Sequence, residues 1–113
     1  MGEFELIVLA TILRLKQEAY GTAIRNDVEE RTQRTVSVGA LYTTLERLEK
    51  KQYLSSRMGE PSGQRGGRAK RFYQVEAQGL EQLKKSWAAL HQACADLPPL
   101  QFRQAHPQID TEV

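Results

Sequence analysis

The sequence has few of the residues that cross-link chains, bind metals or catalyse reactions. Its only cysteine, Cys94, excludes an internal disulfide and fits a reducing compartment, so we expect a cytoplasmic protein. Its two histidines, His91 and His106, have no Cys, His or carboxylate residues at the spacing of a metal site. The stretch RGGR at 65–68 lacks the glycine and lysine spacing of a P-loop. We therefore expect no catalysis, no metal and no cofactor.

A membrane-spanning run is also absent. The apolar stretch from Phe4 to Leu15 is too short to cross a bilayer, contains Arg14, and has no small-residue cleavage site of a secretory leader. Because it is apolar almost all round, it is better interpreted as a buried helix that other elements cover on more than one side. We expect no contact with a membrane.

The net charge of the 113 residues is only +2, so overall charge does not indicate a polyanionic partner. The positive charge is local: residues 57–71 contain five basic residues and one acidic residue, a net charge of +4. The length predicts one small domain with a modest core. Any surface for a polyanion should therefore include this segment.

Helical periodicity predicts a first helix over residues 3–16, a second from about Gly21 to Arg31 and a third from Ser37 to Lys51. Ser37 is a plausible N-cap of the third helix. If its leucines at 41, 45 and 48 face a core, its other face carries small, hydroxyl and basic residues. These outward residues are Ser37, Val38, Gly39, Tyr42, Thr43, Arg47 and Lys50.

This outward face suits entry into a DNA major groove, because a helix that reads base edges there needs a slim end with hydrogen-bond donors. Arg47, Lys50 and Lys51 could then reach flanking phosphates. An ordinary capped helix with a solvated polar face is the alternative. The helix by itself does not decide between the two.

After the third helix, two short strand-like runs, Tyr53–Arg57 and Arg71–Val75, flank a loop rich in Gly, Pro and Ser. They predict a β-hairpin with a long basic tip. The candidate DNA contacts here are Arg65, Arg68, Lys70 and Arg71. A solubilising loop is the alternative, but a basic tip beside a slim helix favours nucleic acid.

The last predicted helix begins near Ala77 and ends at Pro98-Pro99. Its apolar residues recur in steps of three and four, which indicates a seam for another helix. The seam comprises Leu80, Leu83, Trp87, Leu90, Cys94 and Leu97. The fold class is thus mainly α with a small β-hairpin. We divide the chain into a winged helix-turn-helix DNA-binding domain (1–75), a C-terminal dimerisation helix (76–97) and a flexible tail (98–113).

Three stretches carry a family resemblance: EAYGTAI at 18–24, VSVGALYTTLERLEKKQYL at 36–54 and GGRAKRFYQVEAQGLEQL at 66–83. They resemble the PadR family of bacterial transcriptional regulators, in its short form with a single C-terminal helix. The resemblance implies a winged helix, a homodimeric repressor and a recognition helix at 37–51. Two positions depart from the family pattern: Thr43 replaces a common proline, and Glu76 replaces a threonine that opens the last helix, which predicts a weakened cap.

The resemblance also implies small phenolic or aromatic effectors, and in some relatives a tryptophan on the last helix lines a pocket between the subunits. Trp87 is therefore the candidate effector residue. Alternatively, it is only the largest side chain of the dimer seam. In either case Phe4, Ile7 and Tyr20 are candidate neighbours, and Phe4 and Ile7 join the seam in the predicted dimer interface.

We therefore expect a homodimer that binds double-stranded DNA, most simply a repressor of a pseudo-palindromic promoter site that is released by a small effector, which the resemblance suggests is aromatic. Two alternatives stay open. One is a winged-helix module that binds another protein, because fold does not fix function. The other is a ligand-binding dimer without specific DNA binding.

Overall fold

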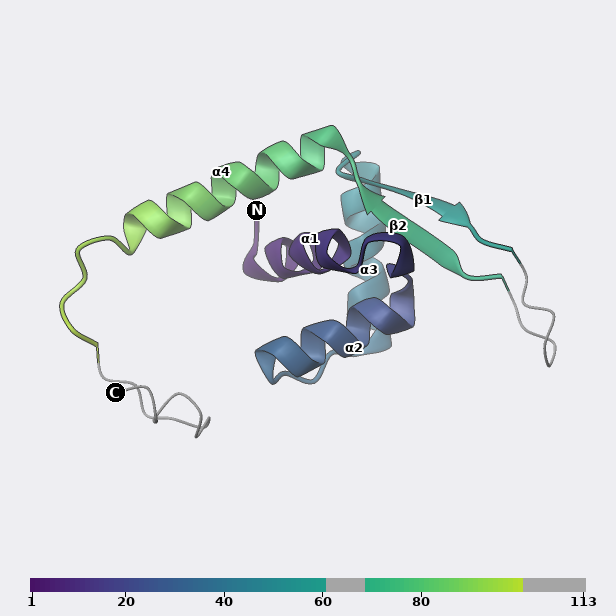
Figure 1. Cartoon of the computed structure of the whole chain (residues 1–113), viewed down its shortest axis with the longest axis horizontal. Helices are drawn as coiled ribbons and strands as arrows, with labels where there is room; N and C mark the ends of the chain where they lie inside the picture. The colour runs from purple at the N-terminus through teal and green to yellow at the C-terminus, as the bar shows by residue number, and fades with distance from the viewer. Residues whose placement is uncertain (61–68, 101–113) are drawn as a thin grey trace.

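The computed structural model describes residues 1–60 and 69–100. Its helices are α1 (Glu3–Leu15), the short 3₁₀ helix η1 (Lys16–Glu18), α2 (Gly21–Thr32), α3 (Val38–Lys50) and α4 (Ala77–Ala93); its strands are β1 (Leu54–Met58) and β2 (Arg71–Val75). In Figure 1 the first three helices form a compact body, the hairpin extends to one side and α4 runs out to the other. The predicted fold class, mainly helical with one hairpin, is confirmed.

The core lies where α1, α2 and α3 meet. The three predicted inward leucines of α3, at 41, 45 and 48, are all buried, as the 3.6-residue period requires. They pack with Val8, Leu9, Ile12, Ile24, Val28, Leu54 and Tyr73. Each buried leucine contributes about 1.5–3 kcal/mol, so these contacts fix the orientation of α3 in the body.

Local hydrogen bonds set the turn between α2 and α3. Gln33, in the left-handed conformation, ends α2, and the side-chain oxygen of Ser37 accepts a bond of 3.0 Å from the backbone N–H of Ala40. The predicted N-cap is therefore confirmed. Val36 between them is held by both of its backbone groups: its N–H donates to Glu29 at 2.7 Å, and its carbonyl accepts from Arg25 at 2.6 Å.

An ion-pair cluster joins α1 to α2. The Asp27 carboxylate pairs with Arg14 of α1 and, at 3.4 Å, with Arg31 of α2. Burial acts to raise the pKa of Asp27, but the hydrogen bond and charge of Arg14, and then those of Arg31, outweigh it and leave the pKa below 3.8. The ionised carboxylate thus stabilises the packing of these two helices.

The hairpin is fastened to the body along β2. β1 and β2 pair antiparallel from Leu54 opposite Val75 to Met58 opposite Arg71, so β1 begins and ends one residue later than predicted. The backbone N–H of Tyr73 donates to Ala19 at 2.8 Å, beside a β-bridge between Tyr20 and Phe72. The strand β2 is therefore positioned by the turn that precedes α2.

Helix α4 begins without a side-chain cap, as Glu76 predicts. The Glu76 carboxylate instead accepts hydrogen bonds from Ser55 and Gln74, which lower its pKa. The first half of α4 packs on the body through Leu83, while Trp87 in the second half is 63% exposed in the single chain. Half of α4 therefore extends beyond the core (Figure 1).

The predicted end of the last helix at the prolines is wrong. α4 ends at Ala93, so Cys94 is its C-cap and Leu97 lies outside the helix. Asp96 adopts a left-handed conformation with φ 60°, which Asp tolerates. Pro98 disfavours the helical region for Leu97 only, so the earlier end of the helix at Ala93 is not set by the proline. Most of the predicted tail, residues 101–113, lies outside the described residues.

In the part of the chain that the structure describes, no helix has the length and apolarity needed to cross a membrane.

Candidate nucleic-acid interface

The N-terminal half of α3 presents a slim, exposed surface on the side away from the core. The residues of this surface are Ser37, Val38, Gly39, Tyr42 and Thr43, all exposed, and Lys50 continues it further along the helix. A Cβ added at Gly39 would meet no atom within 4 Å, so nothing in the described chain covers this point. A helix end of this shape can approach base edges in a major groove.

Tyr42 is held at one edge of this surface by its closeness to α2. A Cβ built on Gly21 would lie 1.9 Å from the Tyr42 hydroxyl oxygen, so only glycine leaves room for the ring there. Tyr73 lies on the hairpin side of the same region: burial raises its pKa, and Tyr42 raises it further. Sequence reasoning missed Gly21 as a functional position, although it lies in the family stretch EAYGTAI.

An acidic residue also stands on this face, and sequence reasoning did not single it out. Glu46 is exposed and lies one turn from both Thr43 and Lys50. A carboxylate in a major groove accepts a hydrogen bond from the N4 amino group of cytosine and is repelled by phosphates. The surface is therefore not uniformly basic.

Arg47 and Lys51 are exposed, and both lie beside the carboxylate of Glu5 in α1, so their expected contact with phosphates stays a prediction. Residues four apart share a helix face, and this face is turned toward the first helix. Of the three predicted phosphate contacts, Lys50 alone makes no ion pair with Glu5 among the described residues.

Toward the tip side of the hairpin strands, cations and aromatic rings alternate. The Lys70 ammonium lies 4.1 Å from the ring centroid of Tyr20, which packs edge-on against Phe72 at 5.6 Å, and Arg57 lies 4.9 Å from the Phe72 centroid. Arg71 donates to the Ser56 hydroxyl at 2.9 Å. These contacts hold the positively charged groups of Lys70, Arg57 and Arg71 on this part of the hairpin.

Two consequences concern the predictions for this region. Within the single chain Tyr20 contacts Phe72 and Lys70, while its expected place near Trp87 concerns the dimer and stays a prediction. Arg65 and Arg68, the predicted contacts of the hairpin tip, lie outside the described residues.

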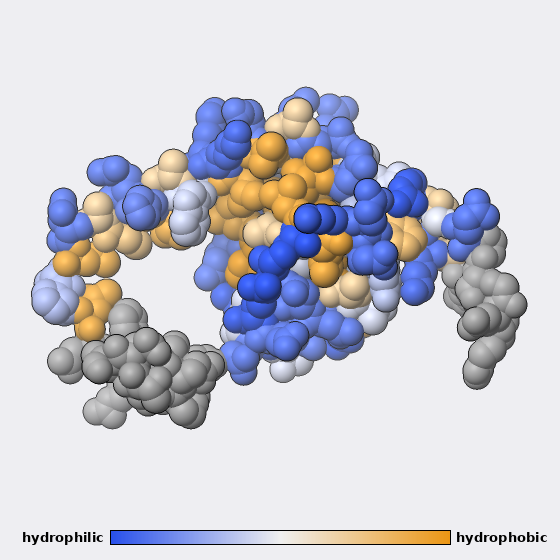
Figure 2. Space-filling view, viewed as in Figure 1, coloured by the Kyte–Doolittle hydropathy of each residue, from blue (hydrophilic) through white to orange (hydrophobic). Residues whose placement is uncertain are grey.

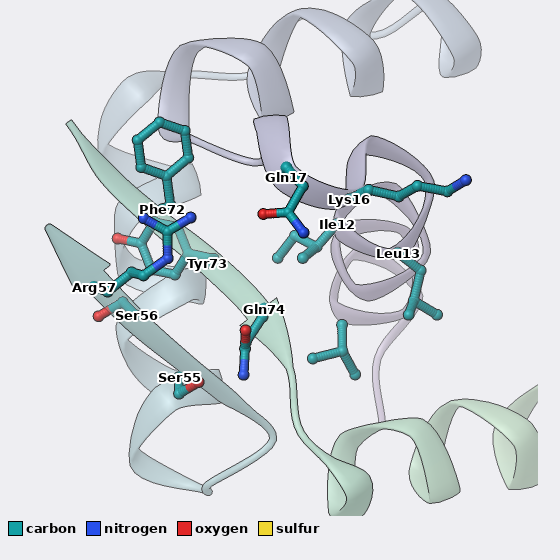
Figure 3. A pocket seen from close by; sticks show the side chains of 11 residues that line it. Ile12, Leu13, Lys16, Gln17, Ser55, Ser56, Arg57, Phe72, Tyr73 and Gln74 are labelled. Carbon is teal, nitrogen blue, oxygen red and sulfur yellow. The ribbon is translucent and has the colours of Figure 1, made fainter. Parts of the chain in front are cut away.

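A cleft of about 530 Å³ lies between the end of α1 with η1 and the strands of the hairpin (Figure 3). Ile12, Leu13 and Val75 give it apolar walls, and Lys16, Gln17, Ser55, Ser56, Arg57, Phe72, Tyr73 and Gln74 complete the lining. Trp87 is not part of it; its ring instead stacks on His91, with centroids 6.1 Å apart. The candidate effector residue and the cleft are therefore separate.

Apolar surface gathers over the middle of the molecule, where α1 lies in Figure 1, and continues along α4 (Figure 2). Phe4 and Ile7 of α1 are half-buried, and Leu80, Trp87 and Leu90 of α4 are exposed. Cys94 and Leu97 are exposed beyond the helix end. The predicted seam thus lies on the surface of the single chain, except for the half-buried Leu83.

Three helices, the second and third joined by a tight turn, followed by a hairpin define a winged helix-turn-helix. The model of the transcriptional regulator PadR-like family matches residues 8–85, more than half of the chain. The protein belongs to this family of transcriptional regulators, which are not enzymes. As a family member it regulates transcription by binding DNA.

Individual relatives agree with this assignment. An uncharacterized protein of Lysinibacillus sphaericus is 32% identical over 92 residues, which span 77% of this chain and 80% of that protein. A PadR family transcription regulator from Clostridium difficile is 28% identical with a TM-score of 0.63, covering 80% of this chain and 94% of that one. A PadR-like regulator from Bacillus cereus shares the fold with a TM-score of 0.67 at 24% identity, over 87% and 93% of the two chains.

Proposed function

We propose that the protein is a homodimeric repressor that binds a pseudo-palindromic promoter site. The observation that carries this proposal is the slim exposed end of α3, together with the cations Lys70 and Arg71 on the tip side of the hairpin strands. In each subunit α3 enters a major groove, where Ser37, Tyr42 and Thr43 contact base edges. The hairpin lies alongside, with Arg65, Arg68, Lys70 and Arg71 on phosphates or in the minor groove. Val38 and Gly39 approach the bases closely, and Lys50 contacts a flanking phosphate.

Dimerisation is supported by the apolar surface that the single chain leaves exposed. Trp87, at 63% exposure, and Leu90 lie on the part of α4 that extends beyond the core. We infer that they pack, together with Leu80, Cys94 and Leu97, against a second copy, with Phe4 and Ile7 of α1 on the same interface. Two-fold symmetry then places the half-sites about 34–36 Å apart.

Release by a small effector is the third part of the proposal. Trp87 and His91 present a stacked pair of flat rings on α4, a surface that suits a small aromatic molecule between two subunits. A ligand that binds one dimer arrangement more tightly changes the separation of the two α3 helices and so weakens DNA binding. A regulator of this kind acts on chromosomal DNA, and we place it in the cytoplasm.

Fluorescence anisotropy tests the DNA-binding core of this proposal. Labelled DNA from upstream of the protein's own gene is compared with a scrambled duplex at two salt concentrations. We expect tighter, salt-sensitive binding to the native fragment. Equal weak binding to both would overturn specific DNA recognition and favour a protein-interaction module instead.

A second titration separates the remaining alternative. Aromatic compounds are added to the free protein while Trp87, the only tryptophan, reports by its fluorescence. Quenching together with release of DNA supports the effector role. Quenching without any operator binding favours a ligand-binding dimer.

A further inference from the structure

One carboxylate links the first helix to the recognition helix. Glu5 is only 7% exposed, although it belongs to an otherwise apolar stretch of α1. Its Oε2 lies 3.4 Å from Nη1 of Arg47 and 3.5 Å from Nζ of Lys51. A buried carboxylate is costly unless it is paired, so these two cations are what makes the burial of Glu5 tolerable.

Arg47 and Lys51 are paired with Glu5 but remain partly exposed to solvent. Their side chains are 50% and 44% exposed for Arg47 and Lys51, whereas the side chain of Glu5 is 10% exposed. The acid is therefore fixed by the body, while the bases are long side chains at its edge that could reach solvent or a polyanion. Removing the acid should leave both cations on the surface, with no need to unfold α3.

We propose that Glu5 is a positioning residue that holds Arg47 and Lys51 against α1 and so withholds two positive charges from the DNA backbone. This inference rests on the proposed function, because it concerns how strongly α3 binds phosphates. Cations bound to a carboxylate in the protein release few counterions from DNA. Glu5 thus lowers sequence-independent affinity and leaves recognition to the N-terminal half of α3.

The same contact connects DNA affinity to the dimer. Phe4 and Ile7, which we place in the dimer interface, lie on the same turn of α1 as Glu5. A movement of α1 in that interface shifts the Glu5 carboxylate relative to α3. The number of cations that α3 offers to phosphates therefore depends on how the subunits are arranged.

The test is the salt dependence of DNA binding by the full chain carrying Glu5→Gln, which keeps the side-chain volume and removes the charge. The slope of log K against log salt should steepen by about 0.9 if one cation is freed and about 1.8 if both are. Between 50 and 200 mM salt, affinity then falls by a further factor of about 3.5 or about 12. The matched control is Glu81→Gln, the same charge change on exposed α4, which should leave the slope unchanged. An unchanged or shallower slope in folded Glu5→Gln overturns the proposal.

A second variant decides the question if Glu5→Gln does not fold. Replacing Lys51 alone with Gln, which leaves Arg47 to pair with the buried Glu5, should make the slope shallower by much less than 0.9, because Lys51 is not available to phosphates. A loss of about 0.9 or more overturns the proposal. Wild-type protein that shows no salt-dependent preference for the native fragment would instead refute the proposed function, so the two failures are distinguishable.

Discussion

Replacing Gly21 with alanine should weaken DNA binding while leaving the fold intact. The new Cβ would lie 1.9 Å from the hydroxyl oxygen of Tyr42 and 2.7 Å from its Cζ. An ordinary contact is about 3.5 Å, so the hydroxyl must move by about 1.6 Å. The Tyr42 side chain is exposed and can swing outward, whereas the backbone of α2 has no reason to move.

The stability of the variant should therefore change little. Alanine in a helix is favoured over glycine by about 0.8–1 kcal/mol in its interior and by less in the first turn, which offsets the lost packing of the ring. DNA binding responds differently, because a displaced base contact costs about 1–3 kcal/mol. The dissociation constant for the native fragment should rise by roughly 5- to 150-fold.

Anisotropy titrations and thermal unfolding of the same samples measure both quantities. Tyr42→Ala is the reference variant, and Gly21→Ala added to it should cause no further loss of affinity, since the two changes act through one side chain. Wild-type affinity in Gly21→Ala would refute the reasoning. So would a double variant whose loss equals the sum of the single losses.

Three further predictions concern stability and assembly. Gly79→Ala should lower the free energy of unfolding by about 1–3 kcal/mol, because its Cβ would lie 2.3 Å from the Tyr53 carbonyl oxygen, and urea denaturation measures this. Trp87→Ala should raise the dimer dissociation constant by about 30-fold or more, the effect of removing a central interface tryptophan; an unchanged constant in sedimentation equilibrium would place the ring outside the interface. Burial acts to raise the pKa of Asp27, but Arg14 and Arg31 lower it overall. The ionised Asp27 carboxylate therefore stabilises the fold above its unfolded pKa of about 3.9, and this stabilisation is lost as the pH falls through the lower folded pKa. Asp27→Asn should therefore show a smaller decrease in unfolding free energy below pH 4 than the wild type, and parallel curves would contradict the assignment.

Much of the fold could be predicted because its elements follow local rules. The buried leucines of α3 recur with the helical period, and the Ser37 cap depends on a residue only three positions away. The hairpin is marked by composition. The end of α4 could not be predicted from Pro98, because a proline restricts only the residue before it and the helix already ends at Ala93.

The candidate site could be predicted only in outline. The outward face of α3 follows from its periodicity, but the position of Arg47 depends on Glu5, which lies 42 residues away along the chain. The sequence around Glu5 gives no sign of its partner. Likewise, the contact between Gly21 and Tyr42 exists only once α2 and α3 have packed. Such long-range pairs are tertiary and are beyond local reasoning.

The outward half of α4 bears on how long a chain survives in the cell. Short helical segments are marginal in water on their own, and the stretch from Trp87 to Ala93 is exposed in the single chain. With dimerisation through this helix, folding of the stretch and association become one equilibrium that depends on concentration. Chains without a partner then expose a frayed segment to proteases, while paired chains do not. Turnover would thus remove unassembled copies and keep the surviving pool competent to bind DNA.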